Sequence, residues 1–471
     1  MKKEKKLMDA ITDVPDEMIE EAKEKGGLLP GSEKSPGKIF RYALAFAACL
    51  LLIAAGIFSL SRAKLGKSPT ENPRLEAARP LMEVSMPPAR SFDDWETAMK
   101  VREENPVEES FTDSLSSFSY ETASALFAGG NENINYSPVS LYYALAMAAT
   151  GAEGETKEEL LSLLGVQDTE TLKEQCGNYY RRSYTENEIS TQKISNSLWL
   201  DTSASWKQSF VENAAENFYA SVFSMELGTE EAAQAMSHWI KEQTDGSLSP
   251  NLSSGGETAL SLINTVLFHD EWIDQFDESK TKPDSFYPSE DSPVTCDFMN
   301  RTYDSHGFCV GEGYTRSSLS LKNGSMVFIL PDEGVSPRSL IDTPEKMRET
   351  FEGGESYYGE VVWQIPKFDF SSSLELGDTL KALGITSAFE ETADFSGITD
   401  DTVFFSGITQ GTHIAVNEEG VDASAFTLID YAGAAMPQGR ADMRLTRPFL
   451  YGVTGAGGEL VFVGICENPV N

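Results

Sequence analysis

The sequence predicts an α+β fold with a large mixed central β-sheet, preceded by one transmembrane helix. Helical segments and strand-like runs alternate irregularly over residues 109–471, with no second linker and no internal repeat. One strand candidate is almost continuously apolar, which is typical of a central strand covered on both faces. Residues 42–60 carry no charged side chain, and their length is close to the ~20 residues that cross a bilayer.

The composition of the 471-residue chain is strongly acidic. It contains 37 Lys and Arg against 74 Asp and Glu, which gives a formal net charge of −37. Binding to nucleic acids and to anionic membrane surfaces is driven by basic contacts, so the charge argues against both as partners of the main domain. A hydrophobic share of 40% is enough for a sizeable core.

The five cysteines are too few for a disulfide-based scaffold in a chain of this length. Cys296 and Cys309 flank a possible hairpin, so they are candidates for one disulfide, and the alternative is that both stay free. Their spacing is not that of a zinc site. We therefore expect no metal and no cofactor.

The N-terminal part favours a membrane anchor. Residues 1–41 are polar and Lys-rich at their start, and the uncharged run 42–60 follows, with Arg41 and Arg62 as close flanks. The run begins too far from the N-terminus for an ordinary secretory signal peptide. A buried helix is the alternative, but buried helices rarely extend this far without a charge. Cleavage before Cys49 is disfavoured because the apolar run continues beyond it.

Residues 61–108 are rich in proline and scattered charges, which is typical of a linker. A short helix is possible around Phe92–Arg102. We predict that the linker connects the anchor to the globular domain at residues 109–471.

Within that domain the sequence predicts helices and strands in mixed order. Ser137 is placed to cap a helix with Pro138 in its first turn, and Gly384 is placed to end another. The predicted helices are Phe111–Phe127, the run to Ala149 that begins at Pro138, Lys157–Leu164 and Leu376–Leu383. The predicted strands are Ile194–Leu200, Ala259–Phe268, Val327–Leu330 and Val361–Ile365.

The stretch from Thr412 to Tyr451 has an unusual pattern. A strand-like run, Thr412–Val416, is followed by an acidic turn and then by small residues. On an extended chain alternate residues share a face, so Val421, Ala423, Ala425 and Thr427 present one row of small or β-branched side chains. Such a row can enter between two existing strands without a steric clash. The alternative is a flexible Ala/Ser/Gly loop.

Several segments in one order resemble the serpins, the serine-protease-inhibitor superfamily. They include the acidic turn with its small-residue run, Arg447-Pro448-Phe449, and the segment from Asn133 to Ser140. Three further segments also match: His238-Trp239-Ile240 with Thr244-Asp245-Gly246, Asn264–Phe268 with Trp272, and Lys381–Thr386 with Asp394–Gly397. The resemblance covers nearly all of residues 110–471.

The resemblance implies a serpin fold with additional sheets, about eight to nine helices and an exposed reactive-centre loop. It also implies an inhibitor rather than an enzyme. A target serine protease attacks the loop, forms an acyl-enzyme and is trapped when the cut loop inserts into the main sheet. A cysteine protease is a further candidate target, and we expect a monomer. The alternative is a non-inhibitory binding or structural protein with the serpin fold.

The resemblance also implies roles for individual residues. The reactive bond is expected at Ala434–Ala435, with Met436 as a neighbouring choice, which suits an elastase-like or subtilisin-like protease. Gln410 stands where serpins often have His, and Trp272 is equally consistent with a plain core residue. The hinge residues are Glu418, Glu419, Gly420, Val421, Ala423, Ala425 and Thr427, and the conformational gates are Ser137, Ser140, Asn264, Gln410 and Trp272.

Catalytic alternatives are weak. The four histidines form no metalloprotease helix and no serine-hydrolase elbow motif is present. His269-Asp270-Glu271 offers a base beside carboxylates, but adjacent residues on a strand point in different directions.

Lys and Arg are only slightly denser before the apolar run than after it. An outward-facing protease inhibitor fits the resemblance, so we expect residues 1–41 in the cytoplasm and the domain outside the cell membrane. The Lys-rich N-terminus with its single span and the short linker favour a bacterial source.

Overall fold

The computed structural model describes residues 79–82, 84–250, 252, 260–289, 292–405, 407–421 and 439–470. The predicted tail and the predicted transmembrane helix 42–60 lie outside these ranges. Within them, no helix is both long enough and apolar enough to span a bilayer. Residues 73–471 form one compact unit.

Nine α-helices occur in the described part of the chain, and the mixture of helices and sheets is the one expected. They are α4 (Trp95–Glu104), α5 (Glu109–Leu126), α6 (Pro138–Ala149), α7 (Gly154–Leu164), α8 (Thr169–Ser183), α9 (Gln208–Phe218), α10 (Glu230–Gln243), α11 (Pro344–Glu352) and α12 (Gly377–Ala382). The predicted cap is present, because the Ser137 side chain accepts a hydrogen bond from the Ser140 backbone at the start of α6.

The first sheet, here called the main sheet, has the strand order β1-β5-β4-β6-β14-β13-β12, with β3 paired to β4. It is mixed, because β4 and β5 are parallel and its other pairs are antiparallel. The strands are β1 (Arg79–Met82), β3 (Thr185–Glu186), β4 (Thr191–Asp201), β5 (Ala220–Met225), β6 (Leu260–Glu271), β12 (Phe368–Glu375), β13 (Thr409–Val416) and β14 (Gly420–Val421).

The second sheet has the order β15-β11-β8-β9-β10-β16-β17-β2, with β7 paired to β8. Its edge strand β15 is parallel to β11 and follows directly after residues 422–438. The strands are β2 (Ile134–Tyr136), β7 (Lys282–Phe286), β8 (Val294–Gly311), β9 (Tyr314–Ser320), β10 (Ser325–Pro331), β11 (Glu355–Pro366), β15 (Arg440–Arg444), β16 (Phe449–Thr454) and β17 (Leu460–Cys466).

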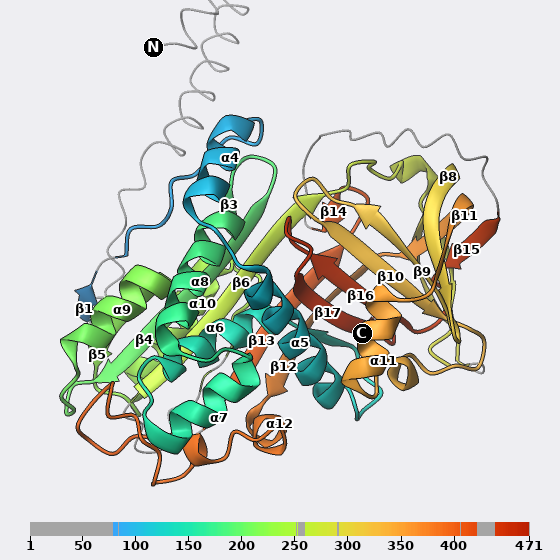
Figure 1. The fold of residues 1–471 in the computed structure, drawn as a ribbon. Coiled ribbons are helices and arrows are strands. Elements are labelled where there is room, and N and C mark those ends of the chain that lie inside the picture. The colour runs from blue at the N-terminus through green and yellow to red at the C-terminus, as the bar shows by residue number, and fades with distance from the viewer. Residues whose placement is uncertain are drawn as a thin grey trace, which may run out of the picture. The chain divides into compact units, whose positions relative to one another are not determined.

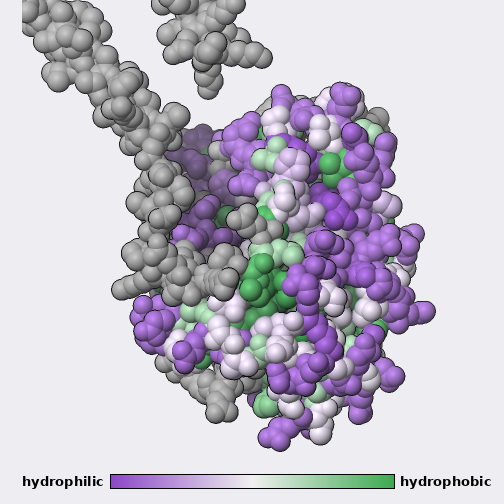
Figure 2. Space-filling model, turned by 90° about the vertical axis from the view of Figure 1, so that its left-hand side faces the viewer, coloured by the Kyte–Doolittle hydropathy of each residue, from purple (hydrophilic) through white to green (hydrophobic). Residues whose placement is uncertain are grey.

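Helices α6, α7 and α8 lie over one face of the main sheet (Figure 1). The second sheet lies on the side of the domain opposite to β1, β5 and β4. One buried apolar cluster fills the space between the helices and the main sheet. Another joins the second sheet to β13 and β14, and it contains Val416 and Val421. Much of the surface shown in Figure 2 is hydrophilic, and apolar side chains gather near its middle.

Part of the predicted linker belongs to the domain. Strand β1 pairs antiparallel with β5 at the edge of the main sheet. The predicted short helix is present as α4, and Asn105 at its end accepts a hydrogen bond from Arg181 of α8. The proline-rich composition hid β1, because an edge strand tolerates proline and needs only a few residues. The ordered domain therefore begins before residue 109.

The Cys296–Cys309 disulfide does not form. Both residues are on β8, where Cys296 is opposite Asp284 and Cys309 is opposite Ser356. The candidate pairing required a hairpin turn between them, and the alternative of two free cysteines is the one observed. One long strand holds them far apart, so their sulfur atoms cannot meet.

Candidate functional site

Strands β6 and β13 are neighbours in the main sheet, but only the short strand β14 bridges them. Val421 lies opposite Val416 of β13 and Asp270 of β6. Below Val421 no ladder joins β6 to β13 among the described residues. We call the space between Leu260–His269 of β6 and Thr409–Ala415 of β13 the slot.

The burial of β6 supports an open slot. Strand β4, which has strands on both sides, is buried almost throughout. In contrast, β6 is half-buried along most of its length, with Thr265 as the exception, and it becomes fully buried where it meets β14, at Asp270 and Glu271. An unpaired strand edge is a template for another strand, because its N–H and C=O groups still need partners.

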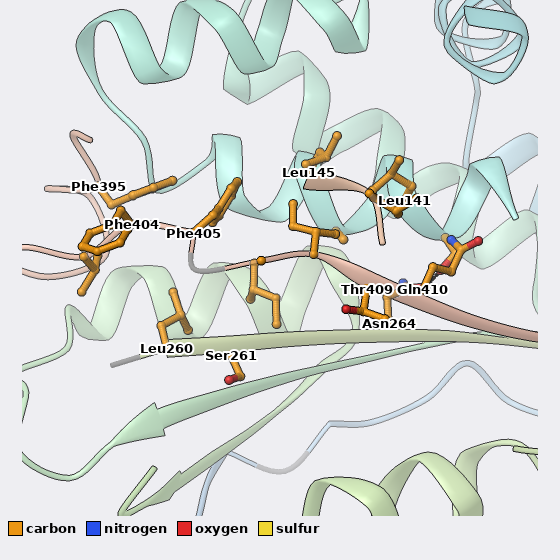
Figure 3. Close-up of a pocket in the computed structure, with 17 residues that line it drawn as sticks. Leu141, Leu145, Leu260, Ser261, Asn264, Phe395, Phe404, Phe405, Thr409 and Gln410 are labelled. Carbon is orange, nitrogen blue, oxygen red and sulfur yellow. Dashed lines mark hydrogen bonds between the residues drawn. The ribbon is translucent and has the colours of Figure 1, made fainter. Parts of the chain in front are cut away.

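Two cavities lie along the slot. The upper cavity has a volume of about 30 Å³ and lies next to Val421, with Val266 and Phe268 on one side and Ile414 on the other. The lower cavity has a volume of about 140 Å³ and is mostly apolar. In Figure 3, Leu141 and Leu145 of α6 lie on one side of it and Leu260 of β6 on the other.

A polar cluster, here called the gate, lies beneath the slot where it meets α6. Gln410 accepts a hydrogen bond from the Ser137 backbone N–H at 2.9 Å and donates one to the Ser137 carbonyl at 2.9 Å. Ser140 donates to the side-chain oxygen of Asn264 on the opposite side of the slot. The predicted gate residues Ser137, Ser140, Asn264 and Gln410 are therefore brought together, and Gln410 satisfies both its donor and its acceptor at the position where serpins often have His.

Sequence reasoning missed one member of the gate. Asn264 donates to the side-chain oxygen of Asn196 on β4, and Asn196 donates to the Phe218 carbonyl at 2.6 Å. Asn196 is fully buried. The signal that could have found it is Ser195-Asn196-Ser197, a polar triplet between the apolar residues Ile194 and Leu198, because buried polar side chains need partners.

The hinge begins with a tight turn before β14. The Asn417 side chain accepts hydrogen bonds from the backbone N–H groups of Glu419 at 2.8 Å and Gly420 at 3.2 Å. Trp272 holds this turn from below, because its indole N–H donates to the Asn417 carbonyl at 2.9 Å and its backbone N–H donates to the Glu419 carbonyl at 3.1 Å. Trp272 is buried and is therefore both a core residue and a hinge contact.

Glu418 anchors the hinge to the second sheet and to β12. Its carboxylate accepts a hydrogen bond from Thr281 at 2.7 Å and pairs with Lys367 at 2.8 Å. Burial alone would raise the pKa of Glu418, but these hydrogen bonds outweigh it and leave the pKa below its ordinary value. Neither partner was predicted from the sequence, because both are far from the hinge along the chain.

The remaining predicted site residues lie outside the described residues. They are the hinge residues Ala423, Ala425 and Thr427 and the reactive-bond residues Ala434, Ala435 and Met436.

Comparison with known proteins gives the family. A family model described as Serpin (serine protease inhibitor) matches residues 113–469. The chain belongs to the serpin family. Serpin-Z7 of Hordeum vulgare is 30% identical over 361 residues, which cover 72% of this chain and 90% of that protein. Serpin B4 of Homo sapiens is 27% identical over 366 residues, covering 72% and 94%.

Solved structures agree with the fold. The crystal structure of the thermophilic serpin tengpin in its native state matches with a TM-score of 0.69 and 25% identity, covering 82% of this chain and 98% of that chain. Thyroxine-binding globulin in complex with thyroxine matches with a TM-score of 0.65 at 23% identity, covering 76% and 99%, which supports the fold alone. Serpins as a family are protease inhibitors and not enzymes, so the prediction that this chain is no enzyme is confirmed.

Proposed function

We propose that this serpin is a suicide inhibitor of a serine protease and that its cut reactive loop inserts into the slot between β6 and β13. The observation that supports this most strongly is β14. The first two residues of the candidate loop pair with both strands, and below them no described strand pairs with the facing edges of β6 and β13. Adding a strand there satisfies those backbone groups.

The register of β14 predicts the neighbours of each inserted residue. Because β14 runs antiparallel to both strands, every residue after Val421 advances one position along each of them. Ala423 then lies between Phe268 and Ile414, and Thr427 lies between Asn264 and Gln410 of the gate. The small-residue row thus continues the buried face of β13, on which Gln410, Thr412 and Ile414 are all buried.

The same register matches side-chain size to space. The small residues Ala423 and Ala425 fall at the narrow upper cavity. Ile429 and Tyr431 fall beside Leu262 and Leu260, which line the larger lower cavity. Filling an apolar cavity with apolar side chains is favourable, because buried apolar area stabilises by about 25 cal/mol per Å². This supports insertion at least as far as Tyr431.

The proposed bait is the Ala434–Ala435 bond, with Met436 as a neighbouring choice. A small apolar residue suits the shallow specificity pocket of elastase-like or subtilisin-like proteases. A cysteine protease forms an analogous acyl-enzyme and is a further candidate target.

The test is to mix the purified full chain with an elastase-like protease and to analyse the products on denaturing gels and by intact mass. We expect a covalent complex together with a released C-terminal peptide that begins at Ala435. Complete cleavage with full protease activity left over would contradict inhibition of that enzyme and favour a non-inhibitory binding protein. The N-terminus of the peptide identifies the bait in either case.

The membrane anchor is a separate part of the proposal. The uncharged run 42–60, flanked by Arg41 and Arg62, supports a single-pass protein of the cell membrane with its inhibitory domain outside and residues 1–41 in the cytoplasm. The bacterial source stays a prediction. In intact cells, added protease should remove the domain and leave the N-terminal tail protected. Recovery of the full chain in the soluble fraction would contradict an anchor.

A further inference from the structure

Asp270 is a carboxylic acid on the buried face of β6, directly beside the hinge. Side chains alternate along a strand, so Asp270 continues the core-facing row of Asn264, Val266 and Phe268. It is fully buried and lies opposite Val421. Neither the gate nor the proposed bait uses it, and a carboxyl group in such a row needs a physical explanation.

Backbone amides hold this carboxyl group in place. One of its oxygens accepts a hydrogen bond from the Asn323 N–H at 2.7 Å, and the other accepts one from the Glu271 N–H at 3.1 Å. Asn323 and Lys322 belong to the turn before β10, so Asp270 connects the end of β6 to the second sheet. These contacts fix the carboxyl group whether or not it carries a charge.

The described charged groups around Asp270 offset its burial only in part. On its own strand it is flanked by His269, whose charge favours the ionised carboxyl group and so lowers its pKa, and by Glu271. Lys322 belongs to the turn before β10, and its side chain pairs with Glu271 at 3.3 Å, where both side chains are 2% exposed. In the described part of the hinge, Glu418 is paired with Lys367 and Glu419 is exposed.

We propose that Asp270 makes the hinge pH-sensitive, so that acid holds Gly420 and Val421 between β6 and β13 and neutral pH favours their release. With β14 in place, Asp270 has no access to water and its neutral form is preferred. When β14 leaves, the edge of β6 at Asp270 opens, and water can solvate the carboxylate. Protonation and hinge pairing therefore favour each other.

The direction and the pH range follow from this linkage. Burial raises the pKa of Asp270 to about 7 with the hinge in the sheet, although the amides of Asn323 and Glu271 act against it. An exposed aspartate has a pKa of about 3.9. The paired state thus binds the proton more tightly, so hinge pairing weakens about tenfold per pH unit as the pH rises from about 5 to about 7. Above pH 7 it levels off, because the carboxyl group is then ionised in both states.

Hydrogen–deuterium exchange of the backbone amide of Val421 in the full chain tests this proposal. After correction for the intrinsic exchange rate, its protection should fall about 50-fold between pH 5 and pH 7 and about twofold more to pH 8. Asp270→Asn keeps the shape without the ionisation and should give a profile without this fall. Glu419→Gln removes an exposed carboxylate from the same hinge and should keep the wild-type profile.

A wild-type profile that is level from pH 5 to pH 7 would overturn the proposal, even if Asp270→Asn failed to fold. So would the same pH profile in wild type and Asp270→Asn. The proposal concerns the hinge of the proposed inhibitor, but the assay contains no protease. An inhibitor that fails to trap its target would therefore contradict the proposed function and leave this result unaffected.

Discussion

Ala423→Arg should turn the inhibitor into a substrate. In the proposed register Ala423 enters the sheet between Phe268 and Ile414, where its side chain faces the core. Burying a guanidinium group there without a partner costs several kcal/mol. A barrier higher by about 4 kcal/mol slows insertion about 1000-fold, so the acyl-enzyme hydrolyses before the protease is trapped. Denaturing gels should show cleaved inhibitor in place of the covalent complex.

Asp422→Arg is the matched control for this variant. Asp422 precedes Ala423 and alternates to the opposite face of the inserted strand, where the native residue is already charged. Both variants place arginine in the hinge, and they differ in the face of the inserted strand on which the arginine lies. Asp422→Arg should keep forming complex. Equal loss of complex in the two variants would mean that charge near the hinge, and not insertion of this row, decides the outcome.

Trp272→Ala should have the largest effect on stability. Trp272 is 1% exposed, packs against Phe276 and donates two hydrogen bonds to the hinge turn. Replacing a buried tryptophan by alanine lowers the free energy of unfolding by about 3–5 kcal/mol. The hinge turn also loses the indole hydrogen bond to the Asn417 carbonyl, so more of the inhibitor should be cleaved as an ordinary substrate. Denaturant unfolding measures the loss of stability. The number of inhibitor molecules consumed for each protease molecule trapped measures the loss of inhibition.

Trp363→Ala separates these two effects. Trp363 is equally buried and also contacts Phe328, but it lies on β11 in the second sheet and its indole N–H donates no hydrogen bond to the hinge turn. It should destabilise the domain by a similar amount, about 3–5 kcal/mol, and leave the amount of inhibitor per protease unchanged. If both variants raise that amount equally, loss of stability alone explains it, and Trp272 has no special role in the hinge.

Local signals carried most of the fold prediction. Ser137 and Pro138 predicted the start of α6, and the apolar run beginning at Ala259 predicted the central strand β6. These are properties of neighbouring residues, so the sequence contains them. The sequence left the pairing of Cys296 and Cys309 open, because it does not show where a strand continues and where it turns. Strand β1 was missed because its partner β5 is far along the chain.

The residues of the candidate site were likewise predicted only in part from the sequence. The gate residues were predicted through their resemblance to serpins, and the structure brings the four of them together beneath the slot. Asn196, Thr281 and Lys367 were missed, because each meets its partner only through tertiary contact. Asp270 appeared in the sequence only as part of a weak catalytic alternative. Its burial beside Val421, which motivates the inferred pH sensitivity, depends on the pairing of three strands.

The most direct test of insertion into the slot is a crystal structure of this serpin after cleavage of its reactive loop. Our account predicts a continuous new strand between β6 and β13, in register with β14. Thr427 should lie between Asn264 and Gln410, and Ile429 and Tyr431 should fill the lower cavity. An empty slot, or a strand shifted by one residue so that the small-residue row faces outward, would contradict the account.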